Sequence, residues 1–263
     1  MQKRFIVFGA TAALLMATLP VFGQQAYRAP RAADGHPDLN GIWQAMNSAN
    51  WDLEAHAAHE SPIVQAGTLL AEPGGLSVVD GGTIPYTPAA LEKKKANQQH
   101  WIDLDPEVRC YLPGVPRATY LPYPFQIFQS EKYLAIAYEY DSAFRNIYLK
   151  DPGPAPIDSW MGQSYGHWEG ETLVVDVTGL DERTWLDRAG DYHSDQLHVV
   201  ERYTPVAPNI LNYEATVEDP KVFSKSWKIS MPLYKHVEKN AQLLEFKCVE
   251  FVEELMYGKY RKK

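Results

Sequence analysis

The amino-acid sequence predicts a mainly-β protein in which antiparallel, up-and-down strands close into a barrel. Short runs rich in β-branched and aromatic residues recur from residue 125 onward, with turns of Asp, Gly, Pro and Asn between them. No strong helix pattern separates these runs, which favours sequential antiparallel pairing over a parallel sheet. The chain has 263 residues, of which 45% are hydrophobic, and this is enough for one large domain.

The first 23 residues have the pattern of a secretory signal peptide. Lys3 and Arg4 form a basic start, an apolar run extends to Leu19, and Val21-Phe22-Gly23 ends in a small residue. A membrane anchor is the alternative, but the apolar run is shorter than a bilayer span requires. We therefore expect cleavage after Gly23 and a periplasmic or secreted protein.

The rest of the chain is expected to be a single domain with two parts. Residues 24–109 contain an irregular arm, the first strand and a short helix, and residues 110–263 contain the main barrel body. The arm is rich in Ala, Arg and Pro. Gly41-Ile42-Trp43 opens the first strand after an Asp-Asn turn. One or two short helices are expected, the best over residues 88–102, because Thr87 can cap it and Pro88 suits a first helical turn.

About nine strands are expected in total. With the strand that begins at Gly41, they cover residues 125–129, 133–140, 144–149, 167–178, 196–204, 211–218, 227–233 and 243–251. Alternation supports them, since Leu211 and Tyr213 share one face while Asn212 and Glu214 share the other. One dry face and one wet face are typical of antiparallel sheet.

Composition restricts the compartment and the partners. Cys110 and Cys248 are the only cysteines, and in an exported chain we expect them to form a disulfide; two inert buried thiols are the alternative. The formal net charge is −8, and loss of Lys3 and Arg4 makes the mature chain more acidic, which argues against a nucleic-acid partner. No amphipathic helix precedes the basic C-terminal tail, so no stable membrane anchor is expected. The sequence does not specify an oligomeric state.

The stretch SYGHWEGETLVVDVT, residues 164–178, is the first candidate for chemistry. Read with a period of two as one strand, it places His167 and Glu169 on the face of Leu173 and Val175. If that face lines a barrel, an imidazole and a carboxylate enter the interior one above the other. If it faces outward, they are ordinary solvated groups.

The second candidate is the polar loop that leads into the strand at 196–204. The loop carries His193 and Asp195, and the strand carries His198 and Arg202 on one face. An inward-facing His and Arg would protonate and polarise a carbonyl or hydroxyl. Alternatively, Arg145 and Arg202 form internal ion pairs that brace the barrel.

Aromatic residues lie in the turns that are expected to rim the barrel mouth. With His198, the candidate substrate-binding residues are Tyr120, Tyr123, Trp160, Tyr165 and Trp185. They are suited to stack on a flat apolar ligand, although aromatic side chains more often pack a core. Three histidines, His167, His193 and His198, match no standard metal-ligand spacing, so no metal is expected. The sequence has no phosphate loop or dinucleotide fingerprint, so no cofactor is expected.

Five segments give the chain a resemblance to a broad family of exported bacterial proteins of largely unassigned function. They are PDLNGIWQ (37–44), CYLPGVPR (110–117), GHWEGETLVVDVTG (166–179), DRAGDYHSDQLHVVERYT (187–204) and EDPKVFSKSW (218–227). Gly41-Ile42-Trp43 is also similar to the entry of lipocalin and related calycin barrels, in which the tryptophan closes the barrel floor. The resemblance implies export and a calycin-type barrel, and it implies no established activity.

We therefore expect an exported enzyme that performs cofactor-free acid–base chemistry on a small apolar or aromatic molecule bound in the barrel. Elimination, isomerisation and hydrolysis are the candidate reactions. His167 and His193 would exchange protons, and Glu169 or Asp195 would orient them. Arg202 would stabilise developing negative charge. The alternative is a non-catalytic periplasmic carrier of a hydrophobic ligand, and a structural domain without a deep cavity is a third possibility.

Overall fold

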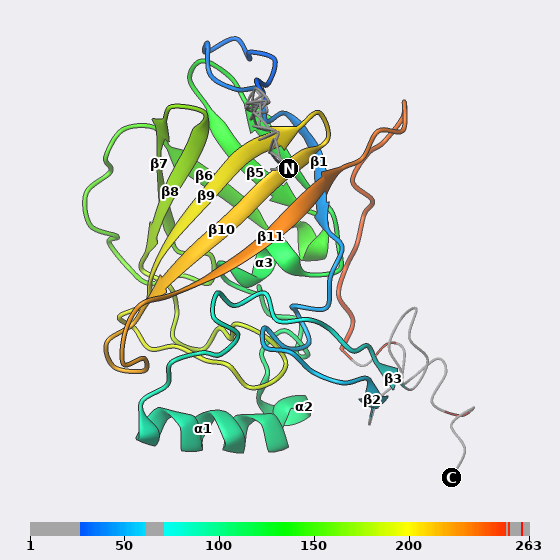
Figure 1. Ribbon diagram of the computed structural model, residues 1–263, viewed down its shortest axis with the longest axis vertical. Helices are drawn as coiled ribbons and strands as arrows, with labels where there is room; N and C mark the ends of the chain where they lie inside the picture. Colours follow the sequence, from blue (N-terminus) through cyan, green and yellow to red (C-terminus); the bar gives the residue numbers. More distant parts are fainter. Residues whose placement is uncertain (1–26, 62–70, 251, 253–258, 260–263) are drawn as a thin grey trace, which may run out of the picture.

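A closed β-barrel dominates the structure. The computed structural model describes residues 27–61 and 71–250, together with residues 252 and 259. Within these residues nine strands follow the order β1-β11-β10-β9-β8-β7-β6-β5-β4, and β1 closes the ring by pairing with β4 (Figure 1). The predicted mainly-β barrel is confirmed. The signal peptide expected over residues 1–23 lies outside the described residues.

The barrel strands follow the hydrophobic pattern of the sequence. Their bounds are β1 Gly41–Ala45, β4 Phe125–Gln129, β5 Leu134–Tyr138, β6 Phe144–Tyr148, β7 Gln163–Glu169, β8 Thr172–Thr178, β9 His198–Ala207, β10 Ile210–Glu218 and β11 Trp227–Lys235. On β10, Leu211 and Tyr213 are buried and Asn212 and Glu214 are partly exposed, as the alternation predicts. A separate two-stranded sheet, β2 (His59–Glu60) with β3 (Ala71–Glu72), was not predicted.

Three details of the strand prediction need correction. The strand expected at 167–178 is two strands, β7 and β8, which form a hairpin. The strand expected at 243–251 does not form, since residues 243–250 are irregular and residue 251 lies outside the described part. The barrel is mixed, because residues 149–162 return the chain to the start of β7, which then pairs parallel with β6.

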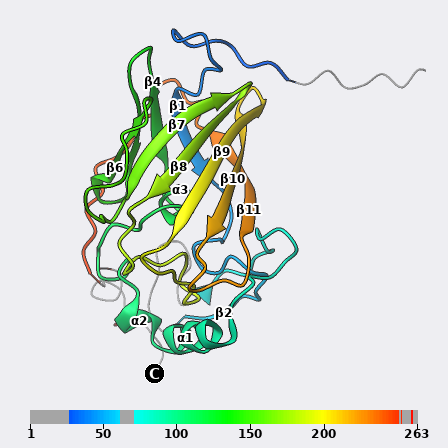
Figure 2. The same ribbon diagram turned by 90° about the vertical axis from the view of Figure 1, so that its left-hand side faces the viewer.

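Short helices gather at one end of the barrel, which we call the base (Figures 1 and 2). α1 (Pro88–Gln99) begins as predicted, with the Thr87 side chain accepting a hydrogen bond from the Ala90 backbone N–H. α2 (Trp101–Leu104) and α3 (Arg117–Tyr120) are single turns, and η1 (Tyr140–Ser142) is a 3₁₀ turn. Among the described helices, none combines the length and apolar character needed to cross a bilayer.

The arm of residues 27–40 lies at the opposite end, which we call the top (Figure 2). Arg31 Nη2 is 2.7 Å from Glu171 Oε1, which ties the arm to the turn between β7 and β8. Gln129 Nε2 donates to Asp34 at 2.9 Å and ties the arm to the end of β4. The arm is therefore attached to the barrel rim at two places.

The Gly-x-Trp motif supplies a core residue at the start of β1. Trp43 is buried, and its indole N–H donates to the Leu39 carbonyl oxygen at 2.9 Å. Lys235, at the end of β11, places its ammonium group 5.4 Å from the centre of the Trp43 ring. This contact joins the first strand to the last strand, which is its neighbour in the barrel.

Candidate functional site

His167 lies on the outer face of the barrel, which corrects its expected place in the interior. Within residues 167–178, Gly170 adopts φ +60° in a two-residue turn, and β7 then pairs so that His167 is opposite Val174. A single unbroken strand would put His167 on the face of the inward-pointing Leu173. The turn shifts that correspondence by one residue, and a shift of one residue exchanges the two faces of a sheet.

A row of histidines and carboxylates crosses the outer face from β7 to β10. At its centre Asp176 lies between two imidazoles, 3.8 Å from His167 Nδ1 and 3.2 Å from His198 Nε2. His198 Nδ1 is 3.3 Å from Glu218 on one side of the row, and His167 Nε2 is 3.4 Å from Glu169 on the other. Each imidazole therefore has a carboxylate near both ring nitrogens.

Arg202 ends this row. Its guanidinium donates to Glu169 at 2.8 Å, and that hydrogen bond, followed by the one to His167, lowers the pKa of Glu169. Three members of the expected catalytic set, His167, Glu169 and Arg202, are thus brought together. They meet on a partly exposed surface, since the His167 side chain is 38% exposed and that of Arg202 34%.

A groove at the top of the barrel adjoins the row. β6 pairs with β7 at only two positions, ending at Tyr148 opposite Tyr165, while β7 continues to Glu169. The groove follows this separation and has a volume of about 620 Å³. Its lining residues are Ala33, Asp34, His36, Glu131, Leu149, Gly166, His167 and Trp168. The His36 and Trp168 rings are parallel, with centroids 4.7 Å apart, so the arm contributes an aromatic pair to the groove.

A polar network occupies the barrel interior. Arg145 Nη2 donates to Glu201 at 2.6 Å and to the Ser164 hydroxyl at 2.9 Å. The hydroxyls of Tyr203 and Tyr213 donate to the same Glu201 carboxylate at 2.9 and 2.8 Å. The internal ion pair considered for Arg145 is therefore present. Because these groups already engage one another, the network braces the barrel walls where a bound ligand was expected.

His193 and Asp195 lie apart from the row, which corrects the expectation that His193 meets His167 in one cavity. His193 is buried in the loop before β9, where its Nε2 is 2.6 Å from the Thr184 hydroxyl and its Nδ1 is 2.8 Å from the Ser194 carbonyl oxygen. Asp195 is half exposed and 2.5 Å from Lys221. Within the described residues, His193 and His167 therefore share no contact partner, and direct proton exchange between them has no geometric basis.

The buried His193 is expected to make the fold sensitive to mild acid. Burial lowers its pKa from the ordinary value of 6.5, so the neutral form is favoured in the folded chain. The stability that the fold gains from a neutral His193 is present above pH 6.5 and is lost as the pH falls through the lowered pKa. Replacing His193 by Gln should reduce the loss of unfolding free energy between neutral pH and about pH 5, by up to about 1.4 kcal/mol per pH unit. Urea unfolding at several pH values measures this, and equal slopes for both proteins would contradict it.

The five aromatic candidates do not surround one mouth. Tyr165 is beside His167, with ring centroids 5.8 Å apart, and is the one that adjoins the row. Tyr120 and Trp185 are buried near the base, and the Tyr120 hydroxyl donates to the Leu186 carbonyl. Tyr123 packs on Phe246, and Trp160 stacks on Tyr111.

No protein-family model matches the chain, and searches of curated proteins and of solved structures find no significant similarity. Its chemistry must therefore be inferred from the geometry of its own residues.

Sequence patterns missed three members of the candidate site. Asp176 links the two histidines, but the sequence alone shows it only as a polar position in an apolar strand. His36 and Trp168 meet across 132 residues of sequence only because the arm folds over the top. The one available signal for Asp176 was its alternation with buried valines, which places a charged side chain on the outer face.

Proposed function

We propose that the protein is an exported barrel enzyme that performs cofactor-free acid–base chemistry on a small organic molecule held in the top groove. His167 is the proton-transferring group. The observation that carries the proposal is that His167 both lines the groove and lies between two carboxylates, Glu169 and Asp176. Asp176, 3.8 Å from the buried Nδ1, would orient the ring, and Nε2, held only by a long 3.4 Å contact to the exposed Glu169, would exchange a proton with a substrate.

The groove fits a ligand of moderate size with a flat apolar part. Its volume of about 620 Å³ is in the range of small-molecule sites. The stacked pair of His36 and Trp168 offers an aromatic surface, and Leu149 adds an apolar wall. Arg202, joined to Glu169 at the edge of the same face, supplies a positive charge near His167. A proton abstraction that creates negative charge, as in elimination or isomerisation, would use these groups.

Export and family membership belong to the same proposal. The Cys110–Cys248 disulfide is consistent with an oxidising compartment. The signal-peptide pattern of residues 1–23 and the resemblance to exported bacterial proteins favour the periplasm or secretion. A non-catalytic carrier is the second candidate, and the aromatic pair in the groove is the observation that favours it, because stacking binds a ligand without converting it.

Replacing His167 by Gln is the direct test. Purified protein is incubated with panels of phenolic, terpenoid and steroid compounds, and products are followed by mass spectrometry. For any compound that is converted, His167→Gln should lower the turnover rate by about 10²–10⁴-fold, the usual contribution of a general acid or base. Binding, measured by calorimetry, should change far less than turnover.

His236→Gln is the matched control. His236 has a side-chain exposure of 34%, close to that of His167, and its Nε2 is 3.1 Å from Gln44 Oε1, outside the groove. This variant should retain full turnover. Conversion that survives His167→Gln would refute the catalytic role of His167, and binding without conversion, abolished by Trp168→Ala, would favour the carrier.

A further inference from the structure

A second cluster of acidic groups lies beneath the barrel, at the base. Asp52 follows β1, and Asp187 and Asp191 belong to the loop before β9. One carboxylate oxygen from each residue lies within 4.8 Å of the others. Asp187 is 0% exposed, Asp191 is 1% exposed, and Asp52 is partly buried. Three carboxylates therefore converge in a place that water reaches poorly.

The backbone of the loop holds two of these carboxylates side by side. The Leu186 N–H donates to the Asp191 carbonyl at 2.7 Å, which closes the loop at its narrow end. The Asp191 N–H donates to Asp187 Oδ1 at 3.2 Å, and the Leu53 N–H donates to Asp187 Oδ2 at 2.9 Å. The bond from Leu53 to Asp187 brings the segment that carries Asp52 against the loop.

Gly190 lets the loop press against α1. Its φ is +89°, and a Cβ at this position would lie 2.6 Å from the Gln98 nitrogen and 2.7 Å from the Lys94 carbonyl oxygen. The Asn97 side chain donates to the Gly190 carbonyl at 3.2 Å and fixes the contact. The acidic cluster is therefore held between the loop and a helix, in a fixed arrangement.

The positive charge in contact with the cluster does not balance it. Lys94 Nζ is 4.0 Å from Asp191 Oδ2, beyond hydrogen-bond distance. Arg117, another cation at the base, is engaged by Asp105 through two hydrogen bonds of 2.8 Å. Three ionised carboxylates in this position would be strongly unfavourable without a further cation.

One oxygen of the cluster lacks a hydrogen bond. Asp191 Oδ1 accepts from the Tyr86 hydroxyl at 2.7 Å, but Asp191 Oδ2 is buried and has no hydrogen-bond partner within the part of the chain that the structure describes. Asp191 is one of the three residues whose carboxylate oxygens lie close enough together to hold an ion. A buried acceptor in a native fold is almost always satisfied, so something is expected to fill this position.

We propose that Asp52, Asp187 and Asp191 bind a hard divalent cation, with calcium as the preferred ion. Carboxylate oxygens are the ligands that calcium takes, at about 2.3–2.6 Å, so two ligand oxygens on opposite sides of one ion are roughly 5 Å apart. The separation of up to 4.8 Å between the oxygens of this cluster matches that geometry. All three side-chain ligands are oxygens, which disfavours zinc and copper. The ion would join the segment after β1 to the loop before β9, far in sequence from either disulfide cysteine.

Calcium and terbium titrations test this site. Thermal unfolding of the full mature chain is recorded after chelation and then with millimolar calcium or magnesium, and terbium luminescence is excited through the protein's aromatic rings. Tyr86, whose hydroxyl is 2.7 Å from Asp191, is an antenna next to the site. Calcium should raise the melting temperature more than magnesium does, and should displace terbium. Asp187→Asn and Asp191→Asn should each weaken terbium binding at least tenfold.

Asp195→Asn is the matched control, because Asp195 lies in the same loop but is paired with Lys221 at the surface. It should leave the calcium response and terbium binding unchanged. If an Asn variant at position 187 or 191 fails to fold, the wild-type titration still decides. A wild-type melting temperature that calcium leaves unchanged would overturn the proposal, and a higher melting temperature for Asp187→Asn would then show that the cluster holds a shared proton instead.

Discussion

Replacing Glu201 by Gln is expected to lower the free energy of unfolding by about 3–5 kcal/mol. The substitution keeps the shape of the side chain and its acceptor for the Tyr203 and Tyr213 hydroxyls, but it removes the charge that balances Arg145. Burial alone would lower the pKa of Arg145, and Glu201 reverses this and raises it well above the ordinary value. An arginine side chain stays protonated at neutral pH even where burial lowers its pKa, so Arg145 stays charged in the variant, inside the barrel, where it is 3% exposed.

The double variant Arg145→Met/Glu201→Gln separates lost charge balance from lost packing. It removes both charges of the buried pair, so it should be more stable than Glu201→Gln alone, although the hydrogen bond from Arg145 to Ser164 is also lost. Urea unfolding followed by tryptophan fluorescence measures both values. Arg202→Met is the control, because Arg202 also lies on β9 and pairs with a glutamate, but on the outer face. Its effect should be far smaller, as for exposed ion pairs generally. A double variant less stable than Glu201→Gln would contradict this account.

The same strand shows what local patterns could predict. Alternation along β9 separates His198 and Arg202 from Glu201 and Tyr203, and the structure has this separation. Alternation does not state which face is the interior, because both faces carry charged residues. The inward Glu201 is tolerated only because Arg145, 56 residues earlier, reaches the same point from β6. That partnership depends on the closure of the barrel, so no short-range pattern indicates it.

The candidate site was predicted in part for the same reason. His167, Glu169 and Arg202 are neighbours because β7 and β9 flank β8, and regular pairing places both His167 and Arg202 opposite Val174. His193 was placed with them because it lies in a polar loop near the same strand, yet its loop folds toward the base and buries the imidazole. His36 was overlooked, because only the path of the arm over the top brings it to Trp168. Pairings within the sheet were accessible from the sequence, and contacts made by loops were not.

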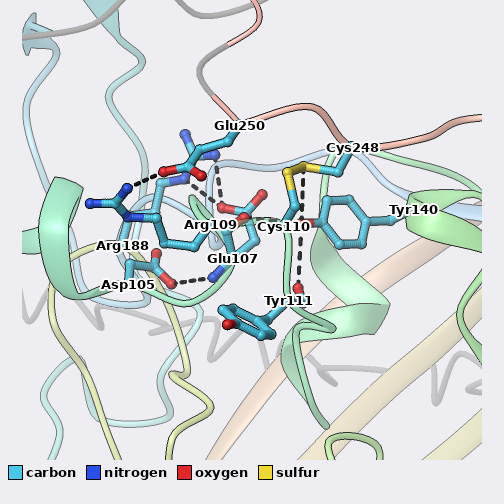
Figure 3. The surroundings of a disulfide bond; sticks show 9 residues. All are labelled: Asp105, Glu107, Arg109, Cys110, Tyr111, Tyr140, Arg188, Cys248 and Glu250. Carbon is cyan, nitrogen blue, oxygen red and sulfur yellow. Dashed lines mark hydrogen bonds and ion pairs between the residues drawn. A yellow bond between two sulfur atoms is a disulfide. The ribbon is translucent and has the colours of Figure 1, made fainter.

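Loss of the disulfide should have an effect of similar size on stability. Cys110 and Cys248 are bonded as predicted (Figure 3). Every strand from β4 to β11 lies within the loop that they close, which spans a sequence separation of 138 residues. Closing so long a loop restricts the unfolded chain, and native disulfides of this kind stabilise by about 2–5 kcal/mol. The double variant Cys110→Ser/Cys248→Ser should therefore unfold at a lower urea concentration than the wild type.

Contacts of the C-terminal segment indicate whether the disulfide stabilises by restricting the unfolded chain or by holding this segment on the folded barrel. After β11 the segment is irregular, but the Leu244 N–H donates to Glu139 at 2.7 Å and the Phe246 ring packs on Tyr123 with centroids 4.6 Å apart. Near the sulfur atoms, Arg109 and Glu250 form an ion pair (Figure 3). These contacts remain in the double serine variant.

Hydrogen exchange therefore distinguishes two explanations of the disulfide's effect. If the bond acts mainly on the unfolded chain, amides of residues 236–250 should exchange at nearly wild-type rates in the serine variant, while the unfolding midpoint still falls. If the bond instead holds the segment on the barrel, these amides should exchange fast and the β4–β5 amides beside them should follow. We expect the first result, because Leu244 and Phe246 already attach the segment at η1, and Phe246 also packs on Tyr123 in the turn before β4. An unchanged midpoint would contradict both explanations.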